Sequence, residues 1–223
     1  MSEEQKHTEE VKEPSSFKLI FTLGVAGFFS GLILVSAYIY TKPIIAQNKA
    51  EALREAIFEV LSKTATFKTL VPDGEGLREV AETEKVGDEV IYLGYDEQGE
   101  MTGFAIPGEE AGYQDIISAN YGFNATDEII IGFKVLDNKE TPGLGDKIIK
   151  DADFQTNFTA LKVNPEIEAV KKGEKKAPNQ VEAITGATIS SKAIVRLLVK
   201  SNAMWQARIK VYMSTQHTST ENK

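Results

Sequence analysis

Residues 19–41 read LIFTLGVAGFFSGLILVSAYIYT, and none of their side chains carries a charge. Lys18 and Lys42 flank this run of 23 residues. At about 1.5 Å per residue, a helix of this length crosses a hydrocarbon core of roughly 30 Å. A core helix would show a polar face, and the apolar region of a cleaved signal peptide is shorter. The run therefore predicts a single transmembrane helix at residues 19–41.

The sequence around this span predicts where the helix ends but not which way it crosses the membrane. Tyr38 and Tyr40 suit a membrane–water interface, and Pro43 is expected to end the helix. Three basic side chains precede the span and three lie within residues 41–58, so their balance gives no orientation. Residues 1–18 are predicted to form a disordered polar tail.

Beyond the span, the apolar pattern predicts an α+β domain. Helical periodicity over residues 42–65 indicates an amphipathic linker helix, and the same periodicity returns over Ser190–Lys210. Short apolar runs between turn sequences predict strands between the two helices, at Val90–Tyr95, Met101–Ile106, Asp115–Ala119 and Glu128–Val135. Strands followed by a helix are typical of the α+β class. We expect the domain to cover residues 66–212 and a short tail to follow it, at residues 213–223.

Composition excludes several kinds of chemistry. The 223 residues carry a net charge of −8, so binding to nucleic-acid phosphates is not expected. There is no cysteine, which excludes thiolate nucleophiles and cysteine-ligated clusters. His7 and His217 lie near the chain ends, so we expect neither a histidine metal site nor a catalytic triad. Redox chemistry would therefore need a bound cofactor, and we predict no catalytic acid or base in the chain itself.

The first motif that could carry chemistry is EAITGATISS at residues 182–191, which opens the C-terminal helix. A helix N-terminus presents unpaired amides and the positive end of the helix dipole. Gly186 and Ala187 would let an anionic group approach the backbone, as in a phosphate site. An ordinary N-cap is the simpler interpretation. A serine nucleophile is disfavoured, because Ile189 stands where a Ser-x-x-Lys pattern needs serine and no interior histidine is present.

The second motif is KETPGLGDK at residues 139–147. Pro142, Gly143 and Gly145 favour an irregular loop with exposed backbone. Composition alone is equally consistent with a plain turn at this position.

The two motifs resemble those of a known family. Residues 185–188, Thr-Gly-Ala-Thr, resemble the flavinylation motif of the FMN-binding domain family, usually written Asp-x-x-Ser/Thr-Gly-Ala-Thr, with Glu182 in place of the aspartate. Residues 140–145 resemble a loop shared by the G subunit of Rnf electron-transport complexes and the C subunit of sodium-translocating NADH:quinone reductases. Lys139, the Asp-Lys continuation of the loop and the Gly112-Tyr113 pair are more similar to the Rnf protein. The resemblance extends from the apolar span to the C-terminal helix.

The resemblance implies a membrane-anchored electron relay that carries covalently bound FMN. Thr188 would hold the FMN phosphate as a phosphoester, and its neighbours in the motif would surround the phosphate, namely Thr185, Gly186, Ala187 and Ser190. The second loop would line the isoalloxazine ring through Glu140, Thr141, Pro142, Gly143, Leu144 and Gly145. Tyr113 is a further candidate for contact with the ring, although a core or rim position suits a tyrosine equally well.

The resemblance also implies partners and a location. The complex would pass electrons between reduced ferredoxin and NAD and translocate ions, with other Rnf membrane subunits as partners and a flavin transferase for maturation. The protein would lie in the inner (cytoplasmic) membrane with the FMN domain on the extracytoplasmic side. Two alternatives remain open: the C subunit of the NADH:quinone reductase, and a membrane-anchored binding or sensor module without redox activity.

Overall fold

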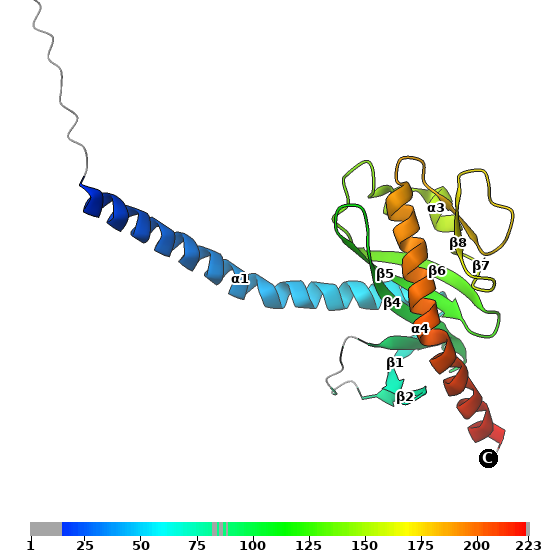
Figure 1. Cartoon of the computed structure of the whole chain (residues 1–223). Coiled ribbons are helices and arrows are strands. Elements are labelled where there is room, and N and C mark those ends of the chain that lie inside the picture. The colour runs from blue at the N-terminus through cyan, green and yellow to red at the C-terminus, as the bar shows by residue number, and fades with distance from the viewer. Residues whose placement is uncertain (1–14, 82–83, 85–86, 88, 222–223) are drawn as a thin grey trace, which may run out of the picture. The chain divides into compact units, whose positions relative to one another are not determined.

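The computed structural model describes residues 15–81, 84, 87 and 89–221 (Figure 1). The chain divides into two compact units, one that ends at Asn48 and one that begins at Lys49. Most of the apolar N-terminal helix lies in the first unit. The second unit contains every strand, the remaining helices and the last turns of the N-terminal helix.

The N-terminal helix is longer than the sequence pattern predicted. Helix α1 runs from Ser16 to Val60 and includes Pro43, so the predicted helix end at that proline is wrong. A proline removes one backbone hydrogen bond, but alanine, leucine, glutamate and arginine follow it and favour a helix. The predicted span and linker are therefore parts of one helix. Within the described residues, α1 alone is long and apolar enough to cross a membrane. Of the predicted tail, residues 1–14 lie outside the described residues.

An antiparallel sheet of seven strands forms the centre of the second unit. Its strands, in chain order, are β1 (Thr66–Asp73), β2 (Gly76–Val80), β3 (Ile91–Tyr95), β4 (Met101–Ala111), β5 (Ile116–Asn124), β6 (Ile129–Asp137) and β7 (Leu161–Lys162). Their order across the sheet is β2-β1-β3-β4-β5-β6-β7. The four strands expected from the sequence correspond to β3, β4, β5 and β6, whereas β1, β2 and β7 were not predicted.

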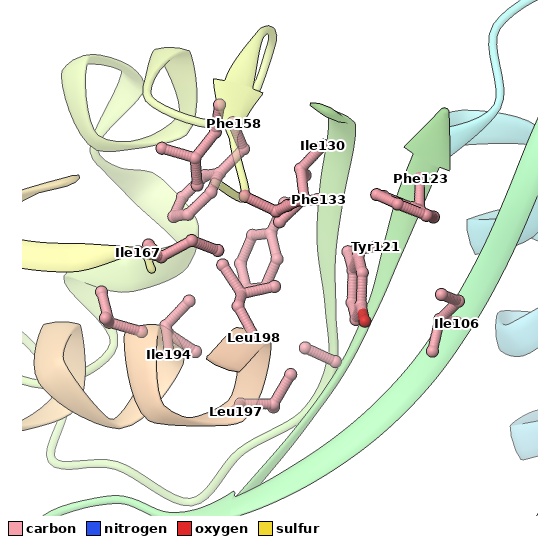
Figure 2. Close-up of a cluster of buried hydrophobic side chains, with 14 of the residues drawn as sticks. Ile106, Tyr121, Phe123, Ile130, Phe133, Phe158, Ile167, Ile194, Leu197 and Leu198 are labelled. Atoms are coloured by element: carbon pink, nitrogen blue, oxygen red, sulfur yellow. The ribbon is translucent and has the colours of Figure 1, made fainter. Parts of the chain in front are cut away.

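Helix α4 (Thr188–Glu221) covers one face of this sheet (Figure 1). Its apolar side, with Ile194, Leu197 and Leu198, faces the aromatic side chains of Tyr121 and Phe133 (Figure 2). All five side chains are buried, and this face forms the main core of the protein. The helix continues to Glu221 and so includes most of the segment that we expected as a tail, residues 213–223.

The last turns of α1 pack against the opposite face of the sheet. Val60 and Ala105 belong to a second, smaller apolar cluster on that face. Two glycines on neighbouring strands, Gly122 and Gly132, allow the helix to lie close to the sheet. A side-chain carbon added at Gly132 would lie only 2.6 Å from the Val60 carbonyl oxygen. The sheet is thus covered on both faces, by α4 on one and by the end of α1 on the other.

A smaller layer lies between β6 and α4 in the chain. It contains the short helices α2 (Lys147–Lys150) and α3 (Ala152–Thr156), and the parallel strands β8 (Glu168–Lys171) and β9 (Gln180–Ala183). Strand β9 leads directly into the loop before α4. The α+β class that the sequence indicated, with one long apolar helix before the domain, is confirmed.

Candidate functional site

The loop between β9 and α4 places a threonine hydroxyl on the surface. Gly186 has a φ of 84°, a conformation that favours glycine, and the Ala187 amide donates to the Ile184 carbonyl at 3.0 Å. The chain turns here and α4 begins at Thr188, whose side chain is exposed. Thr185 and Gly186 are exposed as well, and the space where a side chain would stand on Gly186 is open. This turn leaves room for a bulky group beside the first amides of the helix.

The Ser191 side chain connects this turn to the helix by hydrogen bonds. The sequence did not predict this role. Its buried hydroxyl accepts a hydrogen bond from the Ile184 amide at 3.0 Å and donates to the Ala187 carbonyl at 2.9 Å. Both ends of the turn are thereby held by one side chain. A hydroxyl in the first turn of a helix often bonds to nearby backbone, and this was the available signal.

Glu140 joins the two sequence motifs. Its Oε1 accepts hydrogen bonds from the amides of Tyr113 and Gln114, both at 3.0 Å. Its Oε2 accepts from the Ser190 hydroxyl at 2.5 Å. The structure therefore brings together the loop after β4, the loop after β6 and the first turn of α4, three segments that are far apart in the sequence.

The environment of Glu140 holds the carboxylate in its charged form. Burial raises the pKa of the Glu140 carboxyl, but the hydrogen bonds from Ser190 and from the amides of Gln114 and Tyr113 outweigh it, so the pKa lies below its usual value. The stability that these bonds contribute is present at neutral pH and is lost as the pH falls through the lowered pKa.

The loop at residues 141–146 is ordered by its own polar groups. The Asp146 carboxylate accepts from the Gly143 amide at 2.7 Å and pairs with Lys150. The Thr141 hydroxyl donates to the Gln114 side chain at 2.8 Å, which ties this loop to the one after β4. Pro142, Gly143 and Leu144 are exposed, whereas Gly145 is buried. Sequence reasoning missed Asp146 and Gln114 as supporting residues.

Three large apolar side chains that lie next to the Glu140 contacts in the sequence are exposed. Tyr113 is 69% exposed, and Leu144 and Ile189 are each 51% exposed. The Tyr113 amide itself donates to Glu140, Leu144 precedes Gly145, which packs against the carboxylate, and Ile189 precedes the hydroxyl donor Ser190. An exposed apolar surface beside an open turn suits a flat aromatic ligand with a polar end.

Glu182 contacts a loop outside the two sequence motifs. Its Oε1 accepts from the Gly173 amide at 2.9 Å, so the side chain holds the loop between β8 and β9. The resemblance places Glu182 at the aspartate position of the flavinylation motif, and in the structure its visible role is to support that loop.

Comparison with known proteins identifies the family. A profile of the FMN-binding domain matches residues 112–201, a segment that contains every candidate site residue. The G subunit of an ion-translocating oxidoreductase complex from Methanosarcina acetivorans is 32% identical over 81% of this chain and 89% of its own. The chain belongs to the family of these G subunits. The G subunit of a Na+-translocating ferredoxin:NAD+ oxidoreductase complex from Acetobacterium woodii is 30% identical over 80% of this chain and 87% of its own.

Solved structures agree on the fold of this G-subunit family member. NqrC from Shewanella oneidensis superposes with a TM-score of 0.59 over 74% of this chain and 99% of its own, at 15% identity. The C subunit of a Na+-translocating NADH-quinone reductase from Parabacteroides distasonis gives a TM-score of 0.56 at 18% identity, over 71% of this chain and 92% of its own. The relatives at 32% and 30% identity confirm the resemblance to the Rnf-type G subunit, and the two solved C subunits share its fold.

The residues present fit FMN. The exposed Thr188 hydroxyl lies at the start of α4, where the first amides have no carbonyl partner within the helix. That arrangement suits a phosphate, and the exposed apolar side chains beside it suit the flavin ring. Thr141, Pro142, Gly143 and Leu144 lie in the loop that Glu140 connects to α4. Direct contact of each of these residues with FMN stays a prediction.

Proposed function

We propose that this G-subunit family member is a membrane-anchored electron carrier of an ion-translocating oxidoreductase complex, with FMN attached covalently to Thr188. The observation that carries the proposal is the exposed Thr188 hydroxyl at an open glycine turn, next to the loop that Glu140 fastens to the same helix. The relatives that match over most of the chain are named as subunits of ion-translocating oxidoreductase complexes, two of them ferredoxin:NAD+ oxidoreductases.

Attachment would use the Thr188 hydroxyl as the nucleophile. A flavin transferase would present a flavin nucleotide whose FMN phosphorus carries a leaving group. The threonine oxygen forms a bond to that phosphorus, the bond from phosphorus to the leaving group breaks, and the hydroxyl proton goes to solvent or to the transferase. The amides at the start of α4 lack partners within the helix and would be available to bind the phosphate.

When bound, FMN supplies the electron-transfer chemistry, and the chain provides binding and orientation. Thr188 holds the phosphate end. Tyr113, Leu144 and Ile189 present apolar surface for the ring, and the Gly186 turn leaves room beside the phosphate. No side chain of the chain is assigned as acid or base. Other membrane subunits of the complex would supply and remove the electrons.

The relay proposal predicts that the full-length, flavin-loaded protein does not oxidise NADH by itself. The reason is that the sequence has no Gly-x-Gly-x-x-Gly dinucleotide fingerprint. The measurement is NADH oxidation with an artificial acceptor, run beside reduction of the same flavin by a strong chemical reductant. Bleaching of the flavin absorbance by the reductant but not by NADH is the expected result. Rapid NADH oxidation by the purified protein would instead indicate a self-sufficient enzyme.

We further propose that the FMN domain lies on the extracytoplasmic side, as the family resemblance implies. Protease added to intact spheroplasts should then digest the domain beyond residue 48 and leave a small membrane-protected fragment. A cytoplasmic marker protein in the same sample controls for lysis. Protection of the domain until the membrane is opened would establish the opposite orientation.

A further inference from the structure

We propose that Glu140 is a positioning residue that holds Thr188 in place for flavin attachment, and that its carboxylate does not itself contact FMN. This inference rests on the proposed function. It changes the role that the family resemblance suggested for Glu140, which was to line the isoalloxazine ring.

The carboxylate of Glu140 has little capacity left for a ligand. The residue is 5% exposed, and both oxygens already accept hydrogen bonds from the protein, two at Oε1 and one at Oε2. Ser190, which donates to Oε2, is 1% exposed. Because the carboxylate is buried and its hydrogen bonds come from protein donors, it can affect a ligand at the surface by holding the surrounding segments in place.

The elements that Glu140 holds each carry one part of the proposed site. Its amide donors belong to the loop of Tyr113, its own backbone begins the loop of Leu144, and its hydroxyl donor lies two residues after Thr188. One carboxylate therefore sets the position of the attachment point relative to the ring contacts proposed at Tyr113 and Leu144. Removing it would leave two amides and one hydroxyl without their acceptor, which buried polar groups tolerate poorly.

The packing around Glu140 is shaped to this one side chain. A side-chain carbon at either Gly112 or Gly145 would collide with the carboxylate oxygens. The same carbon on Gly145 would also lie 2.9 Å from the Ser190 hydroxyl oxygen. At Gly143, in the same loop, an added carbon would have nothing within 4 Å. Within this loop, the packing is therefore close at Gly145, beside the carboxylate, and open at Gly143.

The test measures how fast the full-length apoprotein gains covalent flavin. Apoprotein from a host without flavin transferase is incubated in detergent with purified transferase and a flavin nucleotide, and in-gel fluorescence is followed over time. Glu140→Ala and Ser190→Ala should each slow loading by about tenfold, because each removes a buried hydrogen bond to a charged group. The double variant should be no slower than Glu140→Ala alone, since the two residues act as one unit.

Two further variants separate positioning from general loss of stability. Glu110 on β4 forms partly buried ion pairs with two residues of α4, Arg196 at 3.1 Å and Lys200 at 2.6 Å. Glu110→Gln removes the charge from these pairs and changes none of the donors around Glu140. It should lower the melting temperature and load at the wild-type rate. Glu140→Gln keeps the shape and an acceptor for the two amides, so it should load within about threefold of wild type.

Three results would overturn the inference. The first is loading of Ser190→Ala at the wild-type rate, which does not depend on whether Glu140→Ala folds. The second is additive slowing in the double variant, which would indicate two independent contacts. The third is equal slowing by Glu110→Gln and Ser190→Ala, which would indicate general loosening of α4. Failure of the proposed function is distinct from all three, because it would appear as flavin that persists in a Thr188→Val variant.

Discussion

Thr188→Val abolishes the covalent flavin of this protein, if the attachment site is as proposed. Valine has nearly the shape of threonine and β-branching suited to the same rotamers, but its methyl group cannot form a phosphoester. The Thr188 side chain is exposed, and among the described residues its hydroxyl makes one long hydrogen bond, of 3.4 Å, to the Ile184 carbonyl. Loss of the hydroxyl should therefore change stability little. In-gel fluorescence after denaturing electrophoresis should fall from full to background.

The matched control for this variant is Thr185→Val. Thr185 is also exposed and lies three residues earlier in the same motif. It should keep most of its covalent flavin, because its hydroxyl lies before the glycine turn and not at the start of α4. Fluorescence that persists in Thr188→Val and disappears in Thr185→Val would move the attachment site to Thr185.

Deletion of residues 1–48 should release the protein from the membrane completely while the domain still folds and accepts flavin. The compact unit that carries the site begins at Lys49, and the uncharged apolar run of residues 19–41 lies entirely before it. Fractionation by ultracentrifugation should move the truncated protein from the membrane pellet to the soluble fraction. In cells, it should also no longer co-purify with the other membrane subunits of the complex.

A deeper truncation is the control for this result. Deleting residues 1–61 also removes Ile57, Val60 and Leu61, which are buried against the sheet. Each such side chain contributes about 1.5–3 kcal/mol, so this variant should be insoluble or unfolded. If the truncation to residue 49 were equally unstable, the part of α1 before Lys49 would be needed for the fold of the domain.

The sequence predicted the central strands well because their signal is local. Apolar runs bounded by turn residues located β3, β4, β5 and β6. The predictions for β4 and β5 both ended five residues too early, at Ile106 and Ala119, whereas the strands end at Ala111 and Asn124. In β4, Pro107 and Gly108 look like a turn but lie inside the strand, opposite Asn120 and Ala119. Strands β1 and β2 were missed because their polar residues alternate weakly with apolar ones and Pro72 interrupts the pattern.

Other features depended on tertiary contacts that periodicity does not report. Pro43 marked a helix end by local rules, yet α1 continues because the residues that follow favour a helix and its last turns pack on the sheet. The family motifs located Glu140 and Ser190 but could not show that they bond to each other across 50 residues. Gln114 was missed for the same reason, since its side chain bonds to Thr141 across 27 residues. Ser191 and Asp146 were missed although their contacts are local, to Ile184 and Ala187 and to Gly143 and Lys150.

Attachment of the flavin to Thr188 can be tested by locating the flavin in protein purified from native membranes. Trypsin cleavage after Lys176 and Lys192 gives the peptide of residues 177–192, which contains both threonines of the motif. Tandem mass spectrometry should find the mass of one FMN, less one water, on this peptide and on Thr188. An unmodified peptide from protein that still contains tightly bound flavin, or a modification on another residue, would contradict the claim.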